Sequence, residues 1–179
     1  MSEPITIRRY VDVELTPRQV SALDRIFFES SNTKSFASDD ARAAFRERWL
    51  GRYLTHDPQF CYLAVNGRGS VVGYLVGAID DPAKAARFAD IAYFSALASE
   101  TERFPAHLHV NVSPAFRNKG IGSRLIDRFV VDAKAAGVAG VHIVTSAGAQ
   151  NVGFYNRNGF EEIAQAGTGG SLVMLAREL

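Results

Sequence analysis

The spacing of hydrophobic residues changes several times along the chain, and each change predicts a new secondary-structure element. Ile5, Ile7 and, beyond two arginines, Tyr10 predict a short first strand. Thr16 is followed by Pro17 and, three residues on, by Gln19, which is the pattern of a capped helix start. The expected helix buries apolar side chains at helical spacing, namely Val20, Leu23, Ile26 and Phe27.

A polar segment, residues 30–35, separates this helix from a second one. Ser38 precedes Asp39 and Asp40, so a serine cap and two carboxylates in the first turn predict the next helix start. Its apolar stripe consists of Ala44, Phe45, Trp49 and Tyr53.

Two strand-like runs follow, residues 60–65 and 71–79, with the turn 66–69 between them. This pattern predicts a β-hairpin. The connection over residues 80–105 carries an apolar residue every three positions, which predicts an extra helix. These residues are Phe88, Ile91, Phe94 and Leu97.

A strand–helix–strand unit comes next, formed by residues 108–112, 123–136 and 141–144, with Gly137 closing the helix. Such a unit requires parallel strands joined by a right-handed crossover. Three further elements complete the chain: a short helix over 151–158 and strands around 161–164 and 172–176. The order of elements predicts an α/β (α+β) protein with a mixed sheet, in a single domain over residues 1–179.

The junction between the strand and the helix of that unit is rich in glycine and basic residues. It reads Arg117, Asn118, Lys119, Gly120, Ile121 and Gly122. Two glycines permit a tight bend, and a helix that begins there presents unpaired N–H groups and the positive end of its dipole to an anion. Arg117, Lys119 and Arg124 add positive charge. We therefore predict a phosphate-binding turn, and the other interpretation is an ordinary glycine-rich connection.

The spacing within this turn argues against two other phosphate motifs. A P-loop requires a Gly-Lys-Ser/Thr sequence, which does not occur here. A dinucleotide-binding motif requires a third glycine where Leu125 stands, and an acidic residue near positions 139–141, which are Ala, Gly and Val. A nucleotide-dependent enzyme is therefore the weakest alternative.

Two motifs together resemble the GNAT acetyltransferase family. The first is Arg-x-x-Gly-x-Gly at 117–122, after the strand exit Val-Ser-Pro at 112–114, and the second is Phe-Tyr-Asn-Arg-Asn-Gly-Phe at 154–160. The resemblance covers essentially the whole chain. It implies the GNAT fold, a mixed central β-sheet of about seven strands flanked by helices, here with an extra helix between strands 3 and 4. Residues 27–31 and 107–114 more narrowly resemble bacterial acetyltransferases akin to the acetyltransferase-like domain of O-GlcNAc hydrolases.

The resemblance also implies roles for individual residues. The turn at 117–122 would bind the pyrophosphate of acetyl-CoA (coenzyme A). The backbone of Val112 would pair with the pantetheine arm, and the N–H of Val110 would polarise the thioester carbonyl, as an oxyanion hole does. Tyr155 would lie beside the sulfur and act as the general acid.

The general base is left open by the sequence. His109 is the preferred candidate and His107 the weaker one, because imidazole titrates in the useful range. The glutamate that the family often uses would fall at Ala106. Asn151 is a further candidate cofactor contact, although the family's usual spacing does not reach it. Ser123 could cap the helix, contact a phosphate, or do both.

Composition limits the classes of binding partner and the cellular location that we expect for this protein. The chain has 179 residues, 47% hydrophobic and 22% charged, with a formal net charge of +1, so it lacks the basic excess of a dedicated nucleic-acid binder. No run approaches the ~18 apolar residues needed to cross a membrane. Cys61 is the single cysteine and the four histidines are scattered, which predicts no disulfide and no metal site. A cytoplasmic location follows as the expectation.

The predicted function is an acetyl-CoA-dependent N-acetyltransferase. It would transfer the acetyl group to a primary amine, of a small molecule or a peptide, by direct attack in a ternary complex. Cys61 has no obvious neighbouring base, which argues against an acyl-enzyme. The alternative is a non-catalytic acyl-CoA-binding or regulatory domain. Homodimers are common in the family, but the sequence decides neither the oligomeric state nor the acceptor amine.

Overall fold

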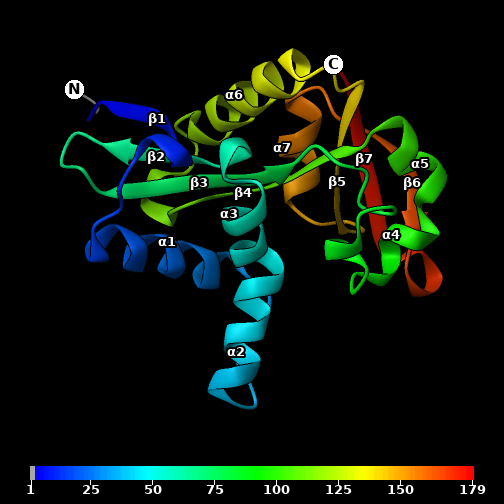
Figure 1. The fold of residues 1–179 in the computed structure, drawn as a ribbon, viewed down its shortest axis with the longest axis horizontal. Helices are drawn as coiled ribbons and strands as arrows, with labels where there is room; N and C mark the ends of the chain where they lie inside the picture. Colours follow the sequence, from blue (N-terminus) through cyan, green and yellow to red (C-terminus); the bar gives the residue numbers. More distant parts are fainter. Residues whose placement is uncertain (1–2) are drawn as a thin grey trace. The chain divides into compact units, whose positions relative to one another are not determined.

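The computed structural model describes residues 3–179, and seven strands form a mixed sheet in the order β1-β2-β3-β4-β5-β7-β6 (Figure 1). The strands are β1 (Ile5–Arg9), β2 (Tyr62–Asn66), β3 (Val71–Ala78), β4 (Ala106–Val112), β5 (Gly140–Ser146), β6 (Glu161–Ala166) and β7 (Leu172–Glu178). β4 and β5 are parallel, with Ala106 opposite Val141 and His107 opposite His142, as the strand–helix–strand pattern predicts. The pairs β1/β2, β2/β3, β5/β7 and β6/β7 are antiparallel.

The helices confirm the predicted order. They are α1 (Pro17–Ser30), α2 (Asp39–Arg46), α3 (Arg52–His56), α4 (Ala92–Ala96), α5 (Ala98–Arg103), α6 (Ile121–Ala135) and α7 (Asn151–Arg157). The capping box of α1 is formed, because the Thr16 side chain accepts from the Gln19 N–H and the Gln19 side chain accepts from the Thr16 N–H. The extra helix expected between β3 and β4 consists of two short helices, α4 and α5, that meet at Leu97. Within residues 3–179, no helix is both long and apolar enough to cross a bilayer.

The chain divides into two compact units. The first contains the residues up to Gly77 together with His109–Phe129, and the second contains Ala78–Leu108 and Val130–Leu179. The prediction of a single domain over 1–179 stays a prediction.

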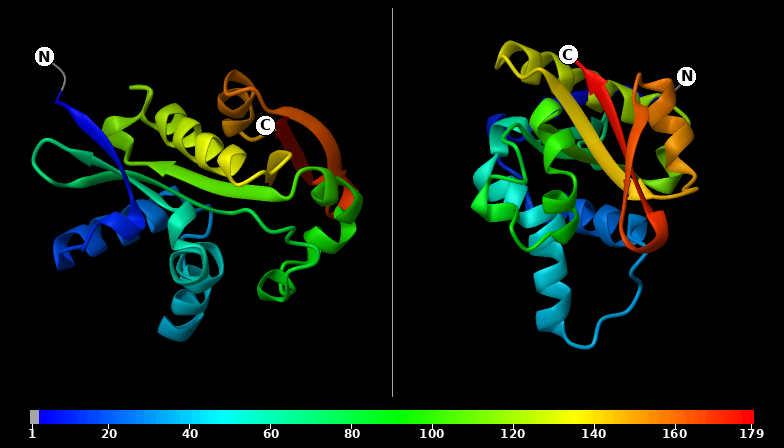
Figure 2. Two further views of the ribbon diagram at one scale, coloured as in Figure 1. Left: turned by 45° about the horizontal axis from the view of Figure 1, so that its top comes forward. Right: turned by 90° about the vertical axis from the view of Figure 1, so that its right-hand side faces the viewer.

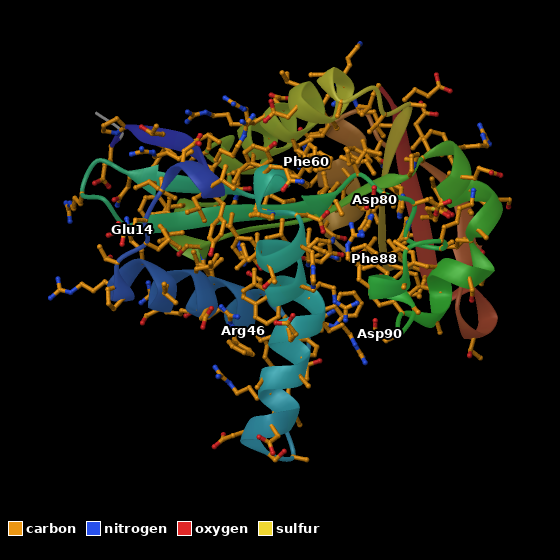
Figure 3. The ribbon with its side chains drawn as sticks, in the orientation of Figure 1. Glu14, Arg46, Phe60, Asp80, Phe88 and Asp90 are labelled. Carbon is orange, nitrogen blue, oxygen red and sulfur yellow. The ribbon has the colours of Figure 1, made fainter. Side chains whose placement is uncertain are left out.

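In the first unit, α1 and α6 lie on opposite sides of the strands (Figure 2). α1 buries Leu23, Ile26 and Phe27, whereas Val20, which was expected on the same buried stripe, is 40% exposed. On the other side, the ring of Phe129 from α6 lies 6.3 Å from that of Phe60, labelled in Figure 3. This contact packs the middle of α6 against the residues that lead into β2.

In the second unit, β7 lies between β5 and β6, and their register aligns Ile143 with Leu175. A hydrophobic cluster joins the helical connection to β7 through Leu97, Phe104, Met174 and Ala176, all nearly fully buried. The apolar residues of the connection therefore cover one face of these strands, as their spacing predicts.

Candidate functional site

The predicted phosphate-binding turn connects β4 to α6 and contains two uncommon backbone conformations. After Val112 the chain makes a short 3-10 turn, Pro114–Phe116. Asn118 and Gly120 then adopt positive φ angles of 60° and 74°. Glycine and asparagine tolerate this left-handed region better than other residues, so the sequence suits the conformation. α6 begins at the next residue, Ile121.

Three consecutive backbone N–H groups of this turn have no acceptor in the described part of the chain. They belong to Asn118, Lys119 and Gly120, all exposed. The N–H of Arg124 bonds to the Gly120 carbonyl at 3.1 Å, which starts the helical ladder. A Cβ built on Gly120 would meet no atom within 4 Å, so the space in front of it is open. Successive free N–H groups at a helix N-terminus form a concave anion site.

The three basic residues around the turn differ in their hydrogen bonds. Arg117 Nε donates to the Val112 carbonyl at 3.0 Å, which ties this side chain back to the end of β4. Lys119 is exposed on the turn itself. Arg124 Nη2 donates to the Ile5 carbonyl at 2.8 Å, so this arginine anchors α6 to β1. Arg117 and Lys119 therefore place positive charge on the turn itself, whereas Arg124 is used to hold α6 against β1.

The end of β4 is held close to β3. The Ser113 N–H donates to the Val72 carbonyl at 2.8 Å. Gly73 permits this approach, because a Cβ there would lie 3.3 Å from Val112 Cγ2. Val110 and Val112 are half-buried on this strand, directly ahead of the turn. The end of β4 is thus held against β3 at Ser113.

His109, the predicted general base, lies against two aromatic side chains from the helical segment after α2. The Tyr53 hydroxyl is 3.3 Å from His109 Nε2. The His109 ring centroid lies 5.5 Å from that of Tyr53 and 5.6 Å from that of Trp49, both at steep interplanar angles. Tyr53 is fully buried and His109 half-buried. The imidazole therefore has a fixed orientation and a polar partner.

The segment that carries these aromatic residues includes a wider helical turn. Glu47–Gly51 form a π-helical turn, in which the Arg52 N–H bonds to the carbonyl five residues earlier. Single π turns of this kind are rare and occur often at functional sites. The sequence predicts Trp49 and Tyr53 as part of a buried stripe, but neither their contact with His109 nor the π turn has a signature in the spacing.

Tyr155, the predicted general acid, is a buried residue of α7 in the second unit. Its ring lies 5.5 Å from that of Phe160 and 5.2 Å from that of Phe154, both roughly edge-on. Burial raises the pKa of the Tyr155 phenol well above its usual value. The hydroxyl is therefore protonated at neutral pH, as a proton donor requires. Asn151 begins the same helix, and its Oδ1 accepts from the Thr145 hydroxyl at 3.0 Å.

The weaker base candidate, His107, is a core residue of the second unit. Its ring stacks on that of His142, with centroids 5.4 Å apart and an interplanar angle of 24°. Phe94 contacts both rings. His142 Nδ1 is hydrogen-bonded to the Phe104 carbonyl, and burial lowers the pKa of His142 to about 4. The burial of both histidines indicates a packing role.

Cys61 is a buried residue with an unreactive thiol. It is 1% exposed, and its thiol donates to the Asp57 carbonyl at 3.4 Å. Burial raises the pKa of Cys61 to about 12, so the thiol is neutral at physiological pH. No group of three or more potential metal ligands occurs within residues 3–179.

The structure corrects the interpretation of Ser123 as a helix cap. α6 begins at Ile121, two residues earlier than expected, so Ser123 lies inside the first turn. The glycine-rich turn gives no clear position for the helix start, because either glycine could precede it. A contact between Ser123 and a phosphate stays a prediction.

Comparison with known proteins agrees with this fold. The family model described as Acetyltransferase (GNAT) family matches residues 21–160. The crystal structure of SsHAT superposes with a TM-score of 0.75 at 22% identity, covering 97% of this chain and 98% of that one. PH1933 from Pyrococcus horikoshii OT3 gives 0.72 at 15% identity, covering 98% and 99%. The NatC complex bound to Gag peptide and CoA gives 0.66 at 12% identity, covering 98% of each chain. Likeness at these identities shows a shared fold.

Proposed function

Because the chain belongs to the GNAT acetyltransferase family, we propose that it is an acetyl-CoA-dependent N-acetyltransferase acting on a primary amine of a small molecule or a peptide. The observation that carries this proposal is the run of three free N–H groups at Asn118, Lys119 and Gly120, immediately before α6. The finer resemblance to the bacterial group akin to the O-GlcNAc hydrolase domain is part of the proposal and rests on short motifs alone.

The residues of the turn fit the pyrophosphate of coenzyme A. Consecutive backbone donors suit adjacent phosphate oxygens, and Gly120 leaves room for close approach. Arg117 and Lys119 supply positive charge, and Ser123 supplies a hydroxyl within the first helical turn. The NatC structure in the comparison contains CoA, which supports the same ligand class here.

Acetyl-CoA supplies the acetyl group as an activated thioester. In the proposed reaction Val110 N–H stabilises the carbonyl oxygen as negative charge develops on it, and Val112 holds the pantetheine arm through its backbone. His109 accepts the proton that the acceptor nitrogen loses as the new C–N bond forms. Tyr155 donates its phenolic proton to the departing sulfur as the C–S bond breaks. Asn151 is proposed as a further cofactor contact.

Direct transfer in a ternary complex is favoured over an acyl-enzyme. The high pKa of Cys61, about 12, keeps its thiol neutral and therefore a poor nucleophile. Amine and thioester would then react without a covalent enzyme intermediate.

Calorimetry with coenzyme A and with acetyl-CoA tests the proposal. Saturable binding of both, and amine-dependent thiol release across a panel of amines, peptides and amino sugars, are the expected results. No binding at near-millimolar ligand would exclude the proposed cofactor. Binding with no thiol release above background would favour the alternative, a non-catalytic acyl-CoA-binding domain.

Tyr155→Phe tests the assignment of the acid. The phenylalanine keeps the ring contacts with Phe154 and Phe160 but cannot donate a proton. We expect kcat to fall by roughly 10²-fold or more while the affinity for coenzyme A changes little. A large loss of affinity with normal turnover would contradict this role.

A further inference from the structure

A second concave site lies in the first unit, where the polar loop after α1 meets α2. It is a cavity of about 560 Å³, open to solvent. α2 extends away from the strands (Figures 1 and 2), and none of its residues is buried. The side chains that matter for its chemistry are Phe28, Lys34, Phe36, Ser38, Asp39 and Arg42.

Interlocking aromatic rings give this cavity a defined wall. Phe28 meets Phe36 edge-on with centroids 5.9 Å apart, and Phe36 lies 5.3 Å from Phe45. Phe45 in turn lies 5.6 Å from Phe27, which is buried against the rest of the unit. The loop is therefore pinned to α1 and α2 through its phenylalanine, although its polar residues are exposed.

Arg42 presents a guanidinium with uncommitted hydrogen-bond donors. Its central carbon lies 3.6 Å from the centroid of the Phe28 ring. Within the described residues, no carboxylate or carbonyl accepts from this guanidinium. Arg46, one turn further along α2 and labelled in Figure 3, differs because both Nε and Nη2 donate to Asp24 Oδ1 at 2.9 and 2.7 Å. Stacking on the Phe28 ring orients the Arg42 guanidinium and leaves the N–H groups at its edge available to a ligand.

A second cation stands in the same cavity. Lys34 Nζ donates to the Glu29 carbonyl at 2.8 Å, which holds the ammonium beside the end of α1 and leaves two of its hydrogens for a ligand. Asp39 is the one acidic side chain in the wall. The two positive charges of Lys34 and Arg42 and the one negative charge of Asp39 give the wall a formal charge of +1, which suits a monoanion.

We propose that this cavity binds an organic carboxylate, with the carboxylate on Arg42 and Lys34 and an apolar group against Phe28 and Phe36. The planar guanidinium fork matches a carboxylate in bidentate geometry, and a ring already stacked on it lowers the entropy lost on binding. The aromatic side chains of Phe28 and Phe36 in the wall favour a ligand with an apolar body over a bare inorganic anion. The site is separate from the turn before α6 and does not depend on it.

The first experiment compares 3-phenylpropionate with 3-phenylpropionamide, by NMR titration of the full chain without coenzyme A. The two probes share the phenyl group but only the first carries a charge. We expect the acid to shift the backbone signals of the loop and of α2, with at least about tenfold tighter binding than the amide. Equal binding of the two, or no binding of the acid up to about 10 mM, would overturn the proposal.

Matched variants locate the binding. Arg42→Gln should weaken binding of the acid at least about tenfold, and Lys34→Gln should weaken it less. Arg25→Gln, on the exposed side of α1, is the control and should change nothing. All three variants should bind coenzyme A like the parent protein, so this test fails or succeeds independently of the proposed function. Unchanged binding of the acid in Arg42→Gln would contradict the site.

A peptide ending in phenylalanine, with a free or an amidated C-terminus, distinguishes the sources of the carboxylate. Tighter binding of the free-acid peptide than of 3-phenylpropionate would identify a chain terminus as the ligand. Binding of 3-phenylpropionate alone would identify a small free acid. Either result supports the carboxylate site, and binding of the amidated peptide as tightly as the free-acid peptide would overturn it.

Discussion

The Tyr53 hydroxyl and His109 Nε2 lie 3.3 Å apart and join a fully buried phenol to a half-buried imidazole. Either group can be the donor, depending on the histidine tautomer. In both cases the contact orients the ring that is proposed to accept the proton of the amine. The phenol is thus a positioning residue for His109.

The strength of this contact can be measured by a double-mutant cycle. Tyr53→Phe should lower the free energy of unfolding by about 1 kcal/mol, because it removes a hydrogen bond and keeps the ring. In a His109→Phe background the same change should cost less, with a coupling of about 0.5–1.5 kcal/mol in urea denaturation. Additive effects of the two substitutions would show that the pair is not hydrogen-bonded in solution.

Gly120→Ala should weaken coenzyme A binding at least about tenfold, because the methyl group would occupy the open space that we propose for a phosphate oxygen. The positive φ of Gly120 also makes alanine strained, at a cost of about 1 kcal/mol in stability. Calorimetry and urea denaturation measure the two effects separately.

Gly137→Ala is the matched control for this prediction. Gly137 has a φ of 79°, and a Cβ there also meets no atom within 4 Å. It should lose similar stability while keeping the affinity for coenzyme A. If both variants bound equally well, the turn before α6 would not be the phosphate site.

Cys61 should react slowly with iodoacetamide in the folded protein. With a pKa of about 12 it contains little thiolate at about pH 8, so alkylation should be slower than for an unfolded cysteine by about three orders of magnitude. Mass spectrometry with and without urea measures the difference. Cys61→Ala should retain turnover, and a loss of more than about tenfold would point to an acyl-enzyme instead.

Stability should fall in mild acid because of His142. Burial lowers its folded-state pKa to about 4 from an ordinary value of 6.5, so the unfolded chain takes up the proton first as the pH falls. Between about pH 7 and about pH 5 the free energy of unfolding should decrease by about 2 kcal/mol from this residue. The hydrogen bond to the Phe104 carbonyl and, less strongly, the Asp81 carboxylate oppose this lowering of the pKa, and His107 stacks on the same ring.

Urea denaturation of the parent protein and of His142→Phe at the two pH values tests this account. The variant loses the bond to the Phe104 carbonyl, so it should be less stable at about pH 7. Its stability should nevertheless depend less on pH than that of the parent. The same slope in both proteins would assign the acid sensitivity to other groups.

The sequence predicts the elements of the fold well because their signals are local. Thr16 and Gln19 cap α1 through side chains three residues apart, and the glycine-rich turn before α6 depends on consecutive residues. The surroundings of His109 could not be predicted, since Trp49 and Tyr53 reach it across more than fifty positions of the chain. The direction of Arg124 was also unpredictable, because its acceptor at Ile5 lies 119 residues away.

The π turn at Glu47–Gly51 gives this part of the chain a tolerance to one change of length. A π turn holds one residue more than an α turn over nearly the same rotation, so deletion of a single residue within it would restore ordinary helical winding and leave Tyr53 facing His109. A deletion that removes Trp49 would thus take one aromatic neighbour from the proposed base and keep the other. The surroundings of His109 can therefore change at this turn without any change in the proposed phosphate-binding turn.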